Sequence, residues 1–511
     1  MKHFLAAAAL LLSPASLAAQ GTSYEQLQAF SGVLSQIRAN YVDSVETAAL
    51  VRAAITGMLA SLDPHSYYVS RSDFEVRRAW DDGRLAVTGL LIEDGERAPV
   101  VVAVQPASPA QKAGVMAGDR VLQVDGVTTT GRGARAVELQ LLGDKGSKVQ
   151  LLLERGPHLD PDTLALTLKR SVVQHQVVPP PRMVSKTVGY VRLEEFTMAG
   201  VPAFKSAVKQ VRSDGAKVLI IDLRGNPGGD VGALVEIAAM FLPAKSDIIH
   251  AQGRKKTGLE TVSTKDDGDF RDLPLIVLVD EGSASASEML AGALQDHDRA
   301  LIVGRRTFGK ALMQMALPLP NGDVVWLTTS RIASPSGRVI QRSYSGVEGQ
   351  RYRELAGKPV NAADTLPLFH THAGRPVRGG GGIAPDVVRE SAPLPTWFST
   401  AADTGLLIAL ADSVAMTLPN NPAARDAWMS DPARWDSLLV TPLLVRVRST
   451  LGVRAEPDAA VRRRLGRILA ARVAEVRWGP EAGAAFEIAT DPDIAIAVEQ
   501  IPRLPTLLGP P

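Results

Sequence analysis

Three short apolar runs, each followed by a loop, constrain the fold of this chain most. Residues 218–221, 275–279 and 301–303 contain only Val, Leu and Ile, which indicates buried strands. A loop rich in glycine follows the first run at 224–230, and helical spacing of apolar residues follows that loop at 231–242. The repeated order of strand, loop and helix predicts an α/β layer whose functional groups lie at the strand ends.

The other segments differ in character, and 511 residues are too many for a single core. We expect a multidomain α+β protein with an N-terminal helical unit, a β-rich module, an α/β core and a C-terminal helical domain. Residues 342–380 are polar and rich in glycine, so we expect an extended loop or insertion there. The expected boundaries are 1–19 for a signal peptide, 20–80 for the helical region, 81–170 for the β-rich module, 171–390 for the core and 391–511 for the C-terminal domain.

The N-terminus has the pattern of a secretory signal. Lys2 and His3 form a short basic segment, residues 4–12 are apolar, and small residues follow up to Ala18 and Ala19. The apolar run is shorter than the roughly 20 residues that cross a bilayer. We therefore expect cleavage after Ala18 or Ala19, a periplasmic location, and no integral membrane segment once the signal is removed.

Composition excludes several classes of protein. The 56 basic and 54 acidic residues leave a net charge of only +2, so no broad positive field would attract nucleic acid. The chain has no cysteine, which excludes disulfides, thiol nucleophiles and zinc–thiolate sites. His370 and His372 have no clear third ligand nearby, so no metal site is expected.

Ser285 has two interpretations. With Glu288 it forms the Ser-x-x-Glu capping box of a helix start, and by itself this structural role is favoured. A catalytic serine would also need a base and donors for an oxyanion. The N–H of Ala286 is next to the serine, at a helix start where such groups lack internal partners. Gly229 is a candidate second donor, although a tight strand–helix turn is the simpler explanation of its loop.

Lys310 is the candidate base. Phe308 and the apolar residues 311–313 surround it in the sequence, and desolvation lowers a lysine pKa because it disfavours the charged form. A neutral lysine can accept the proton of a serine hydroxyl. Serine and lysine together therefore suggest a protease.

Two other kinds of site stay open. Gly304 to Lys310 matches the first part of a phosphate-binding loop, but Ala311 stands where magnesium needs Ser or Thr. A Ser-His-Asp triad would need a histidine such as His297, which adjoins an aspartate but lies at a helix end.

Taken together, the segments resemble the carboxyl-terminal processing peptidases, also called tail-specific proteases. The likeness runs in family order over residues 24–390, and its specific part is the pair 282–288 and 307–310. One departure is Ala311, where the family usually has glycine. The other matching segments are 62–66, 108–114, 118–126, 222–229, 295–296, 335–341 and 382–386. The resemblance implies Ser285 as nucleophile, Lys310 as base, Gln314 as the residue that orients the lysine, Gly229 and Ala286 as oxyanion donors, and Asp296 as a supporting acid.

The module at 81–170 resembles a PDZ domain, which binds an extended C-terminal tail as an added strand. Gly89, Leu90 and Leu91 match its carboxylate-binding loop, with one of the usual two glycines. The resemblance implies a serine endopeptidase without metal or cofactor that cleaves exported proteins near or from their C-termini. Its partners would be proteins or peptides with accessible C-termini, and a homodimer or an adaptor protein is left open. The alternative is a non-catalytic PDZ scaffold that binds peptides.

Overall fold

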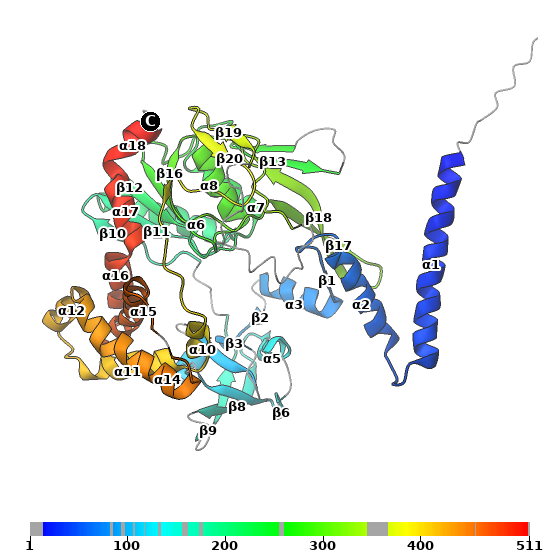
Figure 1. Ribbon diagram of the computed structural model, residues 1–511, viewed down its shortest axis with the longest axis horizontal. Helices are drawn as coiled ribbons and strands as arrows, with labels where there is room; N and C mark the ends of the chain where they lie inside the picture. The colour runs from blue at the N-terminus through cyan, green and yellow to red at the C-terminus, as the bar shows by residue number, and fades with distance from the viewer. Residues whose placement is uncertain are drawn as a thin grey trace, which may run out of the picture.

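Figure 1 shows the computed structural model of the chain. Residues 1–13 of the expected signal peptide and 345–365 of the expected extended loop lie outside the described residues. The structure describes residues 14–81, 85–93, 98–105, 108–116, 118–130, 134–155, 162–172, 177–254, 260–344, 366–454 and 456–508.

A six-stranded sheet forms the α/β core, in the order β10-β11-β12-β15-β16-β21. Strands β11 to β21 run parallel, and β10 is an antiparallel edge. The three apolar runs of the sequence are its central strands, as predicted. The strands are β10 (Arg182–Ser185), β11 (Val188–Arg192), β12 (Val218–Asp222), β15 (Leu275–Val279), β16 (Ala300–Gly304) and β21 (Val387–Val388).

Alternate side chains of β12 enter two different cores, because successive residues of a strand point to opposite faces. Leu219 and Ile221 pack with helices α6 (Gly200–Ser213), α7 (Val231–Ala239) and α8 (Ala286–Asp296). The other face of the sheet packs against Ile494 of α17 (Pro492–Gln500) and Leu504 of α18 (Leu504–Leu508). Figure 1 shows these last helices in red beside the sheet. The C-terminal segment therefore completes the core.

A second, antiparallel sheet was not predicted from the sequence. Its strands are only partly buried and mix polar with apolar residues, so the short apolar run at 324–327 was not identified as a strand. The short strand β1 pairs with β18, where the rings of Tyr67 and Trp326 stack with centroids 6.2 Å apart. The N-terminal region thus contributes a strand to this second sheet. The strands are β1 (Tyr67–Val69), β13 (Asp247–Gly253), β14 (Glu260–Ser263), β17 (Leu312–Pro318) and β18 (Val324–Ala333).

The β-rich module contains the strands that the sequence predicts, in the sheet order β3-β4-β5-β8-β9. Ser108 caps α4 (Pro109–Lys112), and its Oγ accepts a hydrogen bond from the N–H of Gln111 at 3.1 Å. The elements are β2 (Leu85–Ala86), β3 (Leu90–Glu93), β4 (Val100–Val104), β5 (Arg120–Val124), β6 (Val127–Thr128), α5 (Ala134–Leu141), β7 (Gly143–Asp144), β8 (Lys148–Arg155) and β9 (Asp162–Lys169).

Helices form the first and the last described segments of the chain, as predicted, and the C-terminal ones share a core that includes Trp428, Trp435 and Phe486. Within the described ranges, no helix is both long and apolar enough to cross a membrane. A β-hairpin, β19 (Leu368–His370) and β20 (Pro376–Arg378), lies in the segment expected to be an extended loop. The helices are α1 (Pro14–Asn40), α2 (Thr47–Ala60), α3 (Arg71–Asp81), α10 (Trp397–Asp403), α11 (Leu406–Thr417), α12 (Pro422–Met429), α13 (Pro432–Trp435), a π-helical turn (Asp436–Val440), α14 (Thr441–Leu451), α15 (Ala459–Trp478), α16 (Pro480–Thr490) and a 3₁₀ turn (Ile501–Arg503).

Replacement of Trp428 by Ala should destabilise the C-terminal helices. Trp428 is fully buried, and its indole Nε1 donates to the carbonyl of Ala470 at 3.1 Å. Loss of this side chain leaves a cavity and should lower the free energy of unfolding by about 3–5 kcal/mol, measured by chemical denaturation. Val445→Ala, at an exposed position of α14, should change it by less than about 0.5 kcal/mol. Equal effects of the two substitutions would contradict this packing.

Candidate catalytic site

Loops at the carboxyl ends of β12, β15 and β16 bring together the residues predicted to be catalytic. These ends lie at one edge of the parallel sheet, where ligands bind in α/β folds. The loops are also bonded to one another. The N–H of Ala284 donates to the carbonyl of Asn226 at 3.0 Å, and the N–H of Phe308 donates to the carbonyl of Ser283 at 3.1 Å. The loop after β15 is therefore held from both sides.

Ser285 has a strained backbone. Its φ is +57° and its ψ is −115°, which is uncommon for a residue with a side chain and costs on the order of 1–3 kcal/mol. An ordinary N-cap residue is extended. Its N–H donates to Glu288 at 2.9 Å, so this half of the predicted capping box is present. The cap explains the position of Glu288 but not the conformation of Ser285.

Gly228 packs directly against this serine. A Cβ at position 228 would lie 2.8 Å from the Cβ of Ser285 and 2.9 Å from the backbone nitrogen of Ala286. Its φ of +103° also favours glycine. The glycine therefore lets the loop after β12 approach the serine more closely than any other residue would.

Gly229 and Ala286 present the backbone N–H groups predicted as oxyanion donors. Ala286 is the first residue of α8, and Gly229 has a φ of +137°. In the part of the chain that the structure describes, neither N–H has a hydrogen-bond acceptor. Because Gly228 lies against the nitrogen of Ala286, the two donors lie on adjacent segments beside Ser285. Such groups can bind negative charge that develops on an oxygen.

The carboxylate of Glu288 joins the serine loop to the lysine loop. Glu288 is fully buried. Its Oε2 accepts hydrogen bonds from the N–H groups of Ser285 (2.9 Å) and Lys310 (2.8 Å), and its Oε1 accepts from Thr307 (2.5 Å) and the N–H of Gly309 (2.7 Å). Burial raises the pKa of Glu288 to about 7, although the hydrogen bonds from Thr307 and the backbone oppose this rise.

Lys310 follows β16 and is partly buried. Burial lowers the pKa of its ammonium group, whereas the charges of Glu288 and Asp63 act in the opposite direction. The desolvation expected from the sequence is therefore present. The backbones of Lys310 and Ser285 meet at one oxygen of Glu288, but among the described residues no hydrogen bond joins their side chains.

Gln314 lies on β17 and bonds along its own sheet. Its side-chain amide donates to the carbonyl of Leu312 (3.2 Å) and to Oγ1 of Thr328 (3.0 Å) on the neighbouring strand β18. The N–H of Thr328 donates to Oγ of Ser66 at 3.1 Å. Its predicted part in orienting Lys310 stays a prediction, because the described contacts of its amide lead toward Ser66.

His65 and Asp63 lie near Lys310, and the sequence interpretation assigned them no role. The pKa of His65 falls to about 4, first because of burial and then because of the charge of Lys310. Asp63 accepts hydrogen bonds from the N–H groups of His65 and Ser66 (both 2.8 Å) and from the hydroxyl of Ser66 (2.8 Å). The segment 62–66 belongs to the family likeness, but none of its residues is predicted from the sequence to take part in the site.

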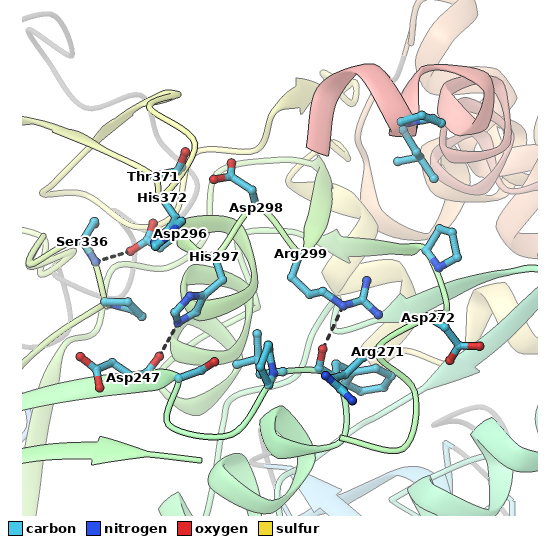
Figure 2. A pocket seen from close by; sticks show the side chains of 18 of the residues that line it. Asp247, Arg271, Asp272, Asp296, His297, Asp298, Arg299, Ser336, Thr371 and His372 are labelled. Carbon is cyan, nitrogen blue, oxygen red and sulfur yellow. Dashed lines mark hydrogen bonds between the residues drawn. The ribbon is translucent and has the colours of Figure 1, made fainter. Parts of the chain in front are cut away.

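Asp296 lies at the other end of α8 from Ser285, and an 11-residue helix is about 16 Å long. It forms an ion pair with Arg338 at 2.7 Å and accepts from the N–H of Ser336 at 3.0 Å. It lies beside His297 (Figure 2), and both residues line a cavity of about 1060 Å³. Residues that precede the central strands line this cavity, so it lies at the sheet edge opposite Ser285.

The alternative sites fit the geometry less well. Lys310 is followed by the strand β17 rather than the helix that a phosphate-binding loop requires. His297 ends α8, and its Nε2 lies 2.7 Å from the carbonyl oxygen of Asp247 (Figure 2), far from the serine at the start of the helix. No group of potential metal ligands occurs among the residues that the structure describes.

Gly89, Leu90 and Leu91 lie at the edge of the module sheet. Leu90 and Leu91 begin β3, which pairs with β4 on one side only. An edge strand offers backbone groups to which a peptide strand can add. Gly89 has a φ of +86°, and a Cβ there would lie 2.1 Å from the Cβ of Ser108, so this loop requires its single glycine.

Comparisons with known protein families match three segments of the chain. Peptidase family S41 matches residues 187–350, a PDZ domain matches 100–155, and the "Activating protease CtpB N-terminal domain" matches 10–72. The first match contains the loops with Ser285 and Lys310, and the second contains most of the β-rich module.

Curated relatives are similar over most of their own length. The chain is 35% identical to a carboxy-terminal-processing protease of Bartonella bacilliformis, over 62% of this chain and 73% of the relative. It is 32% identical to a carboxyl-terminal-processing protease of Picosynechococcus sp., over 55% of this chain and 68% of the relative. A solved structure of a photosystem II D1 C-terminal processing protease is 27% identical, over 73% of this chain and 95% of that one, with a TM-score of 0.40.

Gly228→Ala should abolish most activity of this site. The new Cβ would overlap the Cβ of Ser285, so the serine must move, and displacement of about 1 Å costs roughly 100-fold in rate. Gly337→Ala is the matched control, because Gly337 has a φ of +83° but no atom within 4 Å of the added Cβ. Turnover of a protein substrate, measured beside thermal stability, separates the two. Equal activity of both variants would show that Gly228 does not limit the position of Ser285.

Proposed function

The chain belongs to the carboxyl-terminal processing proteases of peptidase family S41, and from this premise we propose that Ser285 and Lys310 are its catalytic dyad. Neutral Lys310 accepts the proton of Ser285, whose Oγ attacks a peptide carbonyl. The N–H groups of Gly229 and Ala286 hold the oxyanion. Lys310 passes the proton of Ser285 to the amine that leaves, and an acyl-enzyme is formed. Lys310 then accepts a proton from water, whose oxygen attacks the acyl-enzyme, and it gives this proton to Oγ of Ser285 as the ester bond breaks.

The observation that carries this proposal is the convergence of both residues on Glu288. Its Oε2 accepts from the N–H groups of Ser285 and Lys310, so the two loops share one anchor. The same carboxyl group affects the pKa of Lys310. Burial raises the pKa of Glu288 to about 7, which reduces its negative charge near neutral pH. A weaker negative charge stabilises the lysine ammonium less, so it opposes less strongly the lowering of the Lys310 pKa by burial.

The PDZ module supports recognition of C-terminal tails. Its edge strand β3 and the preceding Gly89 provide the backbone groups to which an extended tail would add. We propose that the enzyme cleaves proteins with accessible C-termini, near or from those ends. A serine-type peptidase is established by the family, so the non-catalytic scaffold is set aside. A homodimer or an adaptor protein stays a prediction.

Export to the periplasm is part of the same proposal. It rests on the basic, apolar and small-residue pattern of residues 2–19. N-terminal sequencing of the protein recovered from cells should give a chain that begins near Gln20. Recovery of the unprocessed chain from the cytoplasm would contradict it.

Ser285→Ala and Lys310→Ala should each abolish cleavage of an unstructured protein such as casein. Removal of one member of a nucleophile–base pair costs on the order of 1,000-fold or more. Lys217→Ala, at an exposed surface position, should leave turnover unchanged. Continued cleavage by Lys310→Ala would mean that another group is the base, and His65 would be the first to test.

Activity should rise with pH as Lys310 loses its proton, with a midpoint below the ordinary lysine value of 10.5 because burial lowers its pKa. Between the folded and the unfolded pKa of Lys310, the unfolded chain binds more protons than the folded chain. The free energy of unfolding therefore rises with pH in this window, and at pH values below it the cost of burying the charged lysine is present in full. A profile of kcat/KM against pH measures the midpoint, and thermal unfolding of Lys310→Met measures the stability. A midpoint at or above 10.5 would contradict the assignment.

A further inference from the structure

Asp493, in the first turn of α17, contacts arginines that lie at the catalytic loops. It is almost fully buried. Its Oδ2 lies 2.9 Å from Nη1 of Arg224 and 3.3 Å from Nη1 of Arg305, and its Oδ1 binds Nε of Arg389. One carboxylate from the C-terminal region thus binds three guanidinium groups. Two belong to loops of the α/β core, and the third belongs to Arg389, directly after β21.

Two of these arginines begin catalytic loops. Arg224 follows the end of β12 and precedes the glycines of the oxyanion loop. Arg305 follows β16 and precedes the loop that carries Lys310. Asp493 therefore connects the start of the loop with Gly229 to the start of the loop with Lys310.

The same network reaches the serine loop. Nε of Arg305 lies 2.7 Å from Oε2 of Glu281, which precedes Ser285 by four residues. Asp280 accepts hydrogen bonds from the N–H groups of Gly225 (2.8 Å) and Gly282 (2.9 Å), and it also pairs with Arg305 at 3.5 Å. All three loops of the active site are thus bonded to a network that centres on Asp493.

The carboxylate of Asp493 is not needed to start or to anchor its helix. Asp491 is the N-cap of α17, and its side chain accepts from the N–H groups of Asp493 (2.8 Å) and Ile494 (3.4 Å). Ile494 and Ala497 pack the helix against the sheet. Burial alone would raise the pKa of Asp493, but the bond from Arg389 and the charge of Arg224 keep that pKa below its usual range. The group is therefore ionised at working pH.

We propose that Asp493 is a positioning residue for catalysis: it fixes Arg224 and Arg305, and through them the loops that present Gly229 and Lys310 to Ser285. The inference rests on the proposed roles of Ser285 and Lys310. Without the carboxylate, three partly buried guanidinium groups lose the counter-charge that they share. Asp222 and Asp491 still pair with Arg224, and Glu281 still pairs with Arg305. Among the described residues, however, no other carboxylate joins the two loop starts to each other through the C-terminal helix, so they move apart. The C-terminal helices are then part of the catalytic apparatus.

The test compares Asp493→Asn, Asp493→Glu and Asp298→Asn in the full chain. Asp298 is the matched control, since it is a buried carboxylate that pairs with an arginine, Arg375, at 2.6 Å. It lines the cavity near His297 (Figure 2), at the sheet edge opposite the catalytic loops. We expect Asp493→Asn to lower kcat by about 10- to 100-fold with KM changed less than about 3-fold, since loop displacement affects the reacting groups. Asp493→Glu should recover part of the rate, and Asp298→Asn should keep it.

Hydrogen exchange gives a readout that does not require turnover. Backbone amides at 224–229 and 305–310 should exchange faster in Asp493→Asn than in the wild type, at temperatures where all variants are folded. In Asp298→Asn they should exchange at the wild-type rate. Wild-type kcat and wild-type exchange in Asp493→Asn would overturn the inference, as would equal losses in both variants. Ser285→Ala in the same assay separates the two proposals. If it still cleaves, the dyad is wrong whatever Asp493 does.

Discussion

The buried carboxyl group of Glu288 is the interaction on which the geometry of the active site depends. It accepts hydrogen bonds from backbone groups on both sides of the site, and no water is needed to satisfy it. A buried carboxylate without such donors would be costly. The buried carboxylate therefore depends on these backbone donors, and the two loops depend on the carboxylate to stay together. The strained backbone of Ser285 persists because this bond and the contact with Gly228 determine its position from two directions.

The environment of the lysine is assembled from distant parts of the sequence. Lys310 ends the loop after β16, yet the groups that act on its pKa include Asp63, from the segment before β1. The pairing of β1 with β18 explains this proximity, since it brings Ser66 to Thr328 and thereby to the strand that carries Gln314. The electrostatics of the base thus depend on a short strand of the N-terminal region.

The sequence predicts much of the fold and the central pair of the site. The fully buried strands β12, β15 and β16 contain the continuous apolar runs 218–221, 275–279 and 301–303, so the pattern alone identifies them. Strands β17 and β18 are partly exposed and mix apolar with polar residues, so the short apolar run at 324–327 was not identified as a strand. Contacts such as Asp493 with Arg224 join residues that are far apart in the chain, and neither residue type nor spacing indicates them. The separation of Asp296 from Ser285, in contrast, follows from the sequence, because a helix that starts after Ser285 carries a residue 11 positions later to its far end.

The packing of α17 and α18 on the second face of the central sheet has a consequence for the order in which the chain becomes functional. A chain that emerges from its amino end presents β11, β12, β15 and β16 long before Ile494 and Leu504 are available. Until then one apolar face of the sheet stays uncovered, and the core cannot reach its native stability. The sheet that positions the catalytic loops is therefore fully covered only after the helices at 492–508 have packed on it.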